Sequence, residues 1–159
     1  MCDPVEQDFH SRDRVDDPKI GSSDMLLRHL CMPAQIAETN DGLRISSQAF
    51  RPKKGEPGTS IDHECLLIKN GMTAADRAGL MPNSYGMVGI LAHTAREHSG
   101  GVAWTPKPEE PKLGSFASKP NPFHGEIITP ISKANFRSMA AKADLLWVKP
   151  GERIARYER

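Results

Sequence analysis

The chain lacks the features that would assign it to a membrane or secreted class. No apolar run approaches the roughly 20 residues that a membrane-spanning helix needs. The first residues are acidic and polar, where a secretion signal would be basic and then apolar. These absences predict a cytoplasmic protein without a membrane partner.

The charge balance and the cysteines exclude further classes. The 21 basic residues are matched by 20 acidic ones, and a net charge of +1 gives no overall attraction to nucleic acid. The three cysteines, Cys2, Cys31 and Cys65, are odd in number and form no C-x-x-C pair. We interpret them as free thiols in a reducing compartment, in agreement with a cytoplasmic location.

Length and composition favour a single domain. A chain of 159 residues can bury a core without a disulfide or a structural metal, and its 13 glycines and 13 prolines predict short elements and long loops. Strands and helices alternate without a βαβ rhythm. We predict one α+β domain over residues 24–150, with a small mixed or antiparallel sheet, two or three short helices and long loops. An acidic arm (1–23) precedes it and a basic tail (151–159) follows it.

Apolar patterns and turn residues locate the expected strands. These are Met25–Leu30, Leu43–Ser47, Tyr85–Ala92, Val102–Trp104, Gly125–Ile128 and Leu145–Val148, with a short strand or turn over Thr59–Ile68. The turn Asn40-Asp41-Gly42 is expected because these residues tolerate positive φ.

Capping residues locate two helices. Thr73–Asp76 resembles a capping box and predicts a helix that ends at Gly79. Thr129-Pro130 predicts the start of a second helix. The prolines from Pro106 to Pro122 predict a long irregular loop, a kind of segment that often binds a partner.

Histidines in polar, turn-rich segments suggest a catalytic site. Histidine carries protons near neutral pH, so we expect His93, His98 and His124 to be catalytic, with Glu126 orienting one imidazole. This site requires that strands 85–92 and 125–128 be antiparallel neighbours. It also requires a loop over 93–98, because on a helix His93 and His98 would lie about 140° apart.

An anion site would complete this arrangement. The side chain of Arg96 and the backbone amides of Gly100 and Gly101 can bind a phosphate, as phosphoryl or nucleotidyl chemistry needs. The basic loop Arg51–Lys54 can contact nucleic-acid phosphates or an acidic protein surface, but without interleaved aromatic residues a solvated loop is the favoured interpretation.

A zinc site is a second possibility for the histidines and one cysteine. The candidate ligands are His63, Cys65, His93, His98 and His124. Their spacing matches no compact finger and no H-E-x-x-H pattern, so we assign no metal ligand, and the cofactor is left unknown.

Short sequence segments resemble those of two enzyme families. Arg28 in Leu27-Arg28-His29, then Thr59-Ser60, then Glu126 follow the arginine, serine and glutamate order of ADP-ribosyltransferases, and Leu-Arg-His also resembles the start of RNA 2'-phosphotransferases. The resemblance implies transfer of ADP-ribose from a dinucleotide.

Longer strings resemble a group of small uncharacterised bacterial proteins. These are Arg44–Phe50, Thr59–Asp62 and Asn121–Glu126. This resemblance implies a bacterial, intracellular setting and brings no activity with it.

Two functions of different classes therefore stay open. The favoured one is an accessory protein that binds a protein partner through its arm, its proline-rich loop and its tail. The alternative is a small phosphate-handling enzyme, by phosphoryl, nucleotidyl or ADP-ribosyl chemistry, with a histidine-based site and a nucleotide or nucleic acid as ligand.

Overall fold

A six-stranded antiparallel sheet forms the centre of the molecule. The computed structural model describes residues 15–56, 58–80, 84–106 and 121–148. The strands are β1 (Met25–Leu30), β4 (Gly58–His63), β5 (Gly86–Leu91), β6 (Val102–Trp104), β7 (His124–Ile128) and β8 (Asp144–Val148), in the order β6-β7-β4-β1-β5-β8. A separate hairpin pairs β2 (Ile36–Thr39) with β3 (Gly42–Ile45). The predicted α+β class is confirmed.

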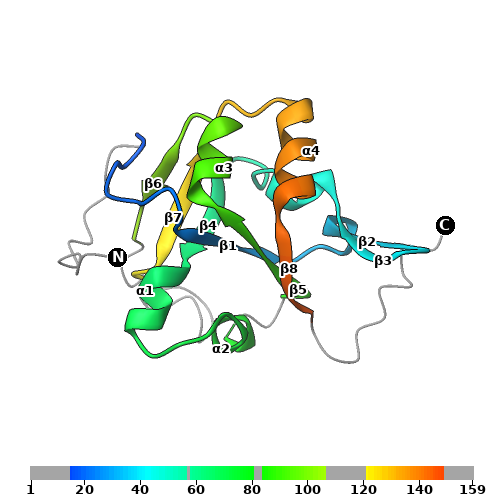
Figure 1. Ribbon diagram of the computed structural model, residues 1–159, viewed down its shortest axis with the longest axis horizontal. Helices are drawn as coiled ribbons and strands as arrows, with labels where there is room; N and C mark the ends of the chain where they lie inside the picture. The colour runs from blue at the N-terminus through cyan, green and yellow to red at the C-terminus, as the bar shows by residue number, and fades with distance from the viewer. Residues whose placement is uncertain (1–14, 57, 81–83, 107–120, 149–159) are drawn as a thin grey trace.

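Helices cover both faces of the sheet. They are α1 (Glu64–Lys69), α2 (Ala74–Gly79), α3 (Ala92–Glu97) and α4 (Lys133–Lys142), with 3-10 turns η1 (Pro33–Gln35) and η2 (Ser47–Phe50). Figure 1 shows α3 and α4 on one side of the sheet and α1 and α2 on the other. The result is three layers.

Each face has its own core. The larger core lies under α3, α4 and η2 and includes Leu26, Phe50, Val88, Ile127 and Met139. The smaller core lies under α1 and α2 and contains Leu27, Leu67, Ala78 and Met87. Successive residues of β1 thus serve opposite cores, as the period of a strand requires.

Several elements agree closely with the sequence prediction. β1 and β6 have the predicted bounds, and α2 ends at Gly79 behind a complete capping box between Thr73 and Asp76. Gly42 has φ of 109°, which explains the glycine in the predicted turn.

Four elements differ from the prediction, and one of them is strand β2, where no strand was expected. The second half of the segment 59–68 is helix α1. Residues 92–97 form helix α3, where a loop was predicted; its N-cap is the apolar Leu91, so no polar capping residue announces it. Helix α4 begins at Lys133, because the Ser132 side chain accepts a hydrogen bond from the Asn135 N–H.

Part of the predicted arm packs against the domain. The N–H of Asp17 donates to the carbonyl of Val102 at 2.8 Å, and Ile20 is buried in the larger core. Asp16 and Asp17 therefore lie against β6, and the Ser22 carbonyl accepts from the His93 N–H of α3. The remainder of the arm, most of the proline-rich loop and the basic tail are outside the described residues.

The oxidation state of the cysteines differs from the prediction that all three are free thiols. Cys65 is disulfide-bonded and Cys31 is free, while Cys2 lies outside the described residues. The prediction of a free thiol at Cys65 is wrong, and the cysteines no longer support a reducing compartment. Among the described residues, no helix is long and apolar enough to cross a membrane.

Candidate functional site

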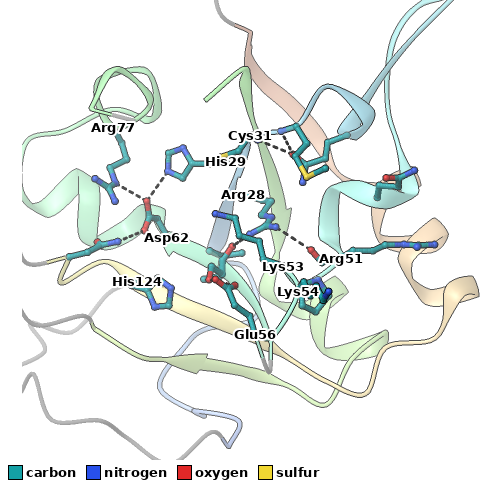
Figure 2. Close-up of a pocket in the computed structure, with 17 residues that line it drawn as sticks. Arg28, His29, Cys31, Arg51, Lys53, Lys54, Glu56, Asp62, Arg77 and His124 are labelled. Atoms are coloured by element: carbon teal, nitrogen blue, oxygen red, sulfur yellow. Dashed lines mark hydrogen bonds and ion pairs between the residues drawn. The ribbon is translucent and has the colours of Figure 1, made fainter. Parts of the chain in front are cut away.

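A pocket of about 440 Å³ opens where β1 and β4 separate. The two strands are paired only at Leu26 with His63 and at Leu27 with Asp62. Beyond that point the side chain of Arg28 connects the strands in place of backbone pairing (Figure 2). The segment 51–56 forms the opposite wall.

Cationic side chains outnumber carboxylates in this pocket. The lining residues include Arg28, Arg51, Lys53, Lys54 and Arg77 as cations, Glu56 and Asp62 as carboxylates, and His29, Ser60, Asn121 and His124. The pocket is therefore positively charged, although the whole chain is nearly neutral.

Arg28 is a buried cation that is bonded to neutral groups. Its side chain donates from Nε to the Ala49 carbonyl at 3.0 Å, from Nη1 to that of Ser60 at 2.8 Å, and from Nη2 to that of Arg51 at 3.2 Å. The residue is 4% exposed, and burial lowers the pKa of its guanidinium, which stays charged because an arginine is not deprotonated in proteins. Within the described part of the chain it forms no salt bridge, so its charge faces the pocket without a directly bonded counter-ion.

Asp62 joins three side chains from different elements. Its carboxylate accepts from His29 Nε2 at 3.0 Å, from Arg77 Nε at 2.8 Å and from Asn121 Nδ2 at 3.1 Å. Burial alone would raise the pKa of Asp62, but the hydrogen bond from His29 and the charge of Arg77 lower it well below its usual range. Asp62 is thus a fixed anion that already accepts three hydrogen bonds.

The bond to Asp62 sets the orientation of His29. A carboxylate only accepts, so Nε2 carries the hydrogen and Nδ1 is the acceptor nitrogen when the ring is neutral. Nδ1 is buried and has no hydrogen-bond partner among the described residues. Histidine held by a carboxylate in this way is a common arrangement for proton transfer.

His124 lies on the other side of Asp62. The two residues are direct partners across β4 and β7, so their side chains share one face of the sheet. His124 Nδ1 lies 2.8 Å from the Thr105 carbonyl, which can only accept, so Nδ1 carries the hydrogen. Two imidazoles, His29 and His124, therefore flank one buried carboxylate (Figure 2).

The loop 51–56 supplies the exposed charges of the pocket. Gly55 adopts φ of 84°, and the Glu56 N–H closes the turn on the Lys53 carbonyl at 2.9 Å. The guanidinium of Arg51 lies 5.7 Å from the centre of the Phe136 ring, which ties this loop to α4. Lys53 and Lys54 are exposed and form no ion pair with a described residue, and they line the pocket beside Arg28.

Of the histidines predicted to be catalytic, only His124 lines the pocket. His93 is exposed on α3 and pairs with Glu97 at 3.1 Å. His98 ends the same helix; its Nδ1 lies 2.9 Å from Asn135 Oδ1 and its Nε2 3.0 Å from Lys142 Nζ. The structure therefore does not bring His93 or His98 into the pocket with His124.

The strand order explains this separation. Strands β5 and β7 are separated by β1 and β4, so the neighbouring positions that the predicted site required do not occur. His124 begins β7, whereas Gly100 pairs with Ile128 at its other end, about 13 Å along the strand.

The predicted anion site at this corner is occupied by internal bonds. Arg96 donates to Asp16 Oδ1 at 2.9 Å and to the Asp17 carbonyl at 2.8 Å. The Gly100 N–H donates to the Ile128 carbonyl, and the Gly101 N–H to Ser99 Oγ. These donors are not directed at a ligand.

The residues of the ADP-ribosyltransferase resemblance lie on adjacent strands. Arg28 is on β1, Ser60 on β4, and Glu126 opposite Ser60 on β7. Arg28 and Ser60 line the pocket, whereas Glu126 does not. In the described part of the chain, no three His, Cys, Asp or Glu residues are grouped so as to hold a metal ion.

His63 lies behind the pocket and is not part of it. Burial lowers the pKa of its imidazole to about 4, although the charge of Asp62 opposes this shift. A Cβ on Gly125 would meet His63 Nε2 at 2.3 Å, so this position accepts only glycine beside the ring. His63 is therefore best understood as a neutral core histidine.

Sequence reasoning missed Asp62 and Arg77 as site residues. The available signal was the pair of polar residues Arg28 and His29 inside the otherwise apolar strand 25–30, since buried polar residues need partners. Comparison of the chain with family models, with curated proteins and with solved structures gives no match.

Proposed function

We propose that this chain is a small phosphate-handling enzyme whose site is the pocket between β1, β4 and the loop 51–56. The observation that carries the proposal is Arg28: a guanidinium that is 4% exposed, bonded to backbone carbonyls and lining a pocket. Buried charges in proteins are normally paired with an opposite charge. An anionic ligand would supply that charge.

The residues around Arg28 fit a phosphate group. Lys53 and Lys54 add positive charge on the same side of the pocket, and the arginine Arg28 can bind phosphate through directed hydrogen bonds. The resulting field would also stabilise negative charge that develops on a phosphoryl group during reaction.

His29 and His124 are the proposed proton carriers. His29 is held by the Asp62 carboxylate and His124 by the Thr105 carbonyl, so one nitrogen of each ring carries a fixed hydrogen. The other nitrogen of each ring is the proposed site of proton exchange; it is buried, so the exchange requires that a bound ligand reach it. This retains the predicted role of His124 and assigns its companion role to His29, in place of His93 and His98. The accessory function rests on segments that lie outside the described residues, and no observation in the pocket favours it.

A binding experiment with lysine variants tests the anion site. The double variant Lys53→Gln, Lys54→Gln removes two exposed charges at the pocket, and Lys69→Gln, Lys133→Gln removes two exposed charges elsewhere. Calorimetric titration with pyrophosphate should show affinity reduced roughly tenfold in the first variant only, because each phosphate contact is charge-assisted. Equal affinities in the two variants would show that the pocket is not the anion site.

Turnover tests the enzymatic part of the proposal. Phosphate monoesters, phosphodiesters and a pyridine dinucleotide would be supplied to the full chain, and the products followed by mass spectrometry. His29→Gln should retain pyrophosphate binding and lower kcat about 100-fold or more, as expected for a lost proton carrier. A chain that binds pyrophosphate and turns over none of the three substrates would be a binding protein and not an enzyme.

A further inference from the structure

The pocket is larger than a phosphate group needs. Its volume of about 440 Å³ lies within the roughly 300–1,000 Å³ of pockets that hold whole small molecules. The cations account for one part of a ligand. The other polar groups of the lining must therefore match the rest of it.

The two carboxylates of the pocket differ in what they can still accept. Asp62 already accepts three hydrogen bonds, from His29, Arg77 and Asn121. Glu56 is half-buried, and among the described residues its carboxylate accepts one long hydrogen bond, of 3.3 Å, from Ser60 Oγ. No ion pair between Glu56 and a described cation is seen, so its carboxylate keeps acceptor capacity toward the pocket.

A free carboxylate weakens a site that binds only an anion, because like charges repel across the pocket. A carboxylate does improve binding of a ligand that presents hydroxyl groups beside its phosphate, since ionised carboxylates are strong acceptors from O–H donors. Ser60 Oγ lies next to Glu56 and can donate or accept in the same hydrogen-bond network.

We infer that the ligand is a phosphate ester with vicinal hydroxyls, a sugar phosphate or a ribonucleotide. Its phosphate lies against Arg28, Lys53 and Lys54, and its hydroxyls donate to the carboxylate of Glu56. The inference rests on the proposed phosphate site and names its substrate class. A second role for Glu56, balancing the charge of Arg28, makes a different prediction, because it would not depend on the hydroxyls of the ligand.

Titration of the full chain with a ligand series tests the inference. The series is inorganic phosphate, ribose 5-phosphate, adenosine 5'-monophosphate, its 2'-deoxy form and its 2',3'-dideoxy form. The ribo ligand should bind roughly tenfold or more tighter than the dideoxy ligand, because the dideoxy form leaves the Glu56 carboxylate without its donors. Tight binding of ribose 5-phosphate alone identifies a sugar phosphate, and a gain with the adenosine ligand identifies a nucleotide.

The variant Glu56→Gln separates the two roles of this side chain. It keeps the shape of the residue and removes its charge, and Glu38→Gln on the exposed hairpin is the matched control. In Glu56→Gln the ratio of ribo to dideoxy affinity should fall several-fold, because the amide oxygen is a weaker acceptor than the carboxylate, while inorganic phosphate binds as well as before or better. A ratio unchanged from that of the parent chain overturns the inference and leaves the phosphate site standing, whereas a chain that binds no member of the series overturns both. Thermal unfolding of each variant confirms that it is folded.

Discussion

The pocket and the α3 corner contain the same kinds of residue in opposite electrostatic states. In the α3 corner, Arg96 is paired with Asp16 and His93 with Glu97, and both pairs are partly exposed. In the pocket, Arg28 is buried against carbonyls, Asp62 is surrounded by donors, and Glu56 is the second carboxylate. The comparison teaches that composition does not locate a site. A site is indicated where a charge is removed from water and left without an opposite charge.

The first prediction compares the two arginines. Arg28→Met should lower the free energy of unfolding by on the order of 3 kcal/mol, since it leaves one buried and two partly buried carbonyls without their donor. Arg96→Met should cost less than about 1 kcal/mol, because its partner Asp16 is 40% exposed and solvent screens the pair. Urea unfolding of both variants measures the difference. Similar losses in the two would remove the distinction drawn between these regions.

The second prediction compares a buried and an exposed histidine through pH. Burial lowers the pKa of His63 from 6.5 to about 4, so between these values the unfolded chain binds a proton that the folded chain does not. The stabilisation is fully present above pH 6.5 and falls as pH drops toward 4, by on the order of 3 kcal/mol.

Urea unfolding at pH 7, 5.5 and 4 measures this effect. His63→Gln cannot titrate and should show a shallower loss than the parent chain, while His93→Gln should follow the parent because His93 is exposed. An identical slope in the His63→Gln chain would mean that His63 is not the group responsible.

Local sequence signals predicted most of the fold. The strand 25–30 was predicted from its apolar residues, although Arg28 and His29 lie within it. Helix α2 was predicted from the capping box that Thr73 and Asp76 form. Helix α3 could not be predicted in this way. Its six residues are held by the burial of Ala92 and Ala95 against the sheet, a tertiary contact that no cap or periodicity records.

The candidate site was predictable only in pieces. Arg28, the loop 51–54 and His124 each stood out in the sequence, but their convergence depends on strand order. The strand order β7-β4-β1 places Asp62 between His29 and His124. The positions of these residues along the sequence do not reveal which strands are neighbours in the sheet. Asp62 is followed directly by His63, whose pKa is lowered by burial in the core. The polar segment 62–64 therefore contains a pocket residue next to a residue of the core.

The third and smallest expected effect concerns His93 and His98, the histidines that the sequence favoured. Each is bonded on α3 to side chains at the surface, so His93→Gln and His98→Gln should each change the free energy of unfolding by less than about 0.5 kcal/mol. Pyrophosphate affinity and kcat should stay at the parent values, because neither side chain lines the pocket. A kcat lowered by His98→Gln to the level of His29→Gln would move the site to the α3 corner, since proton transfer needs a group within hydrogen-bond reach of the substrate.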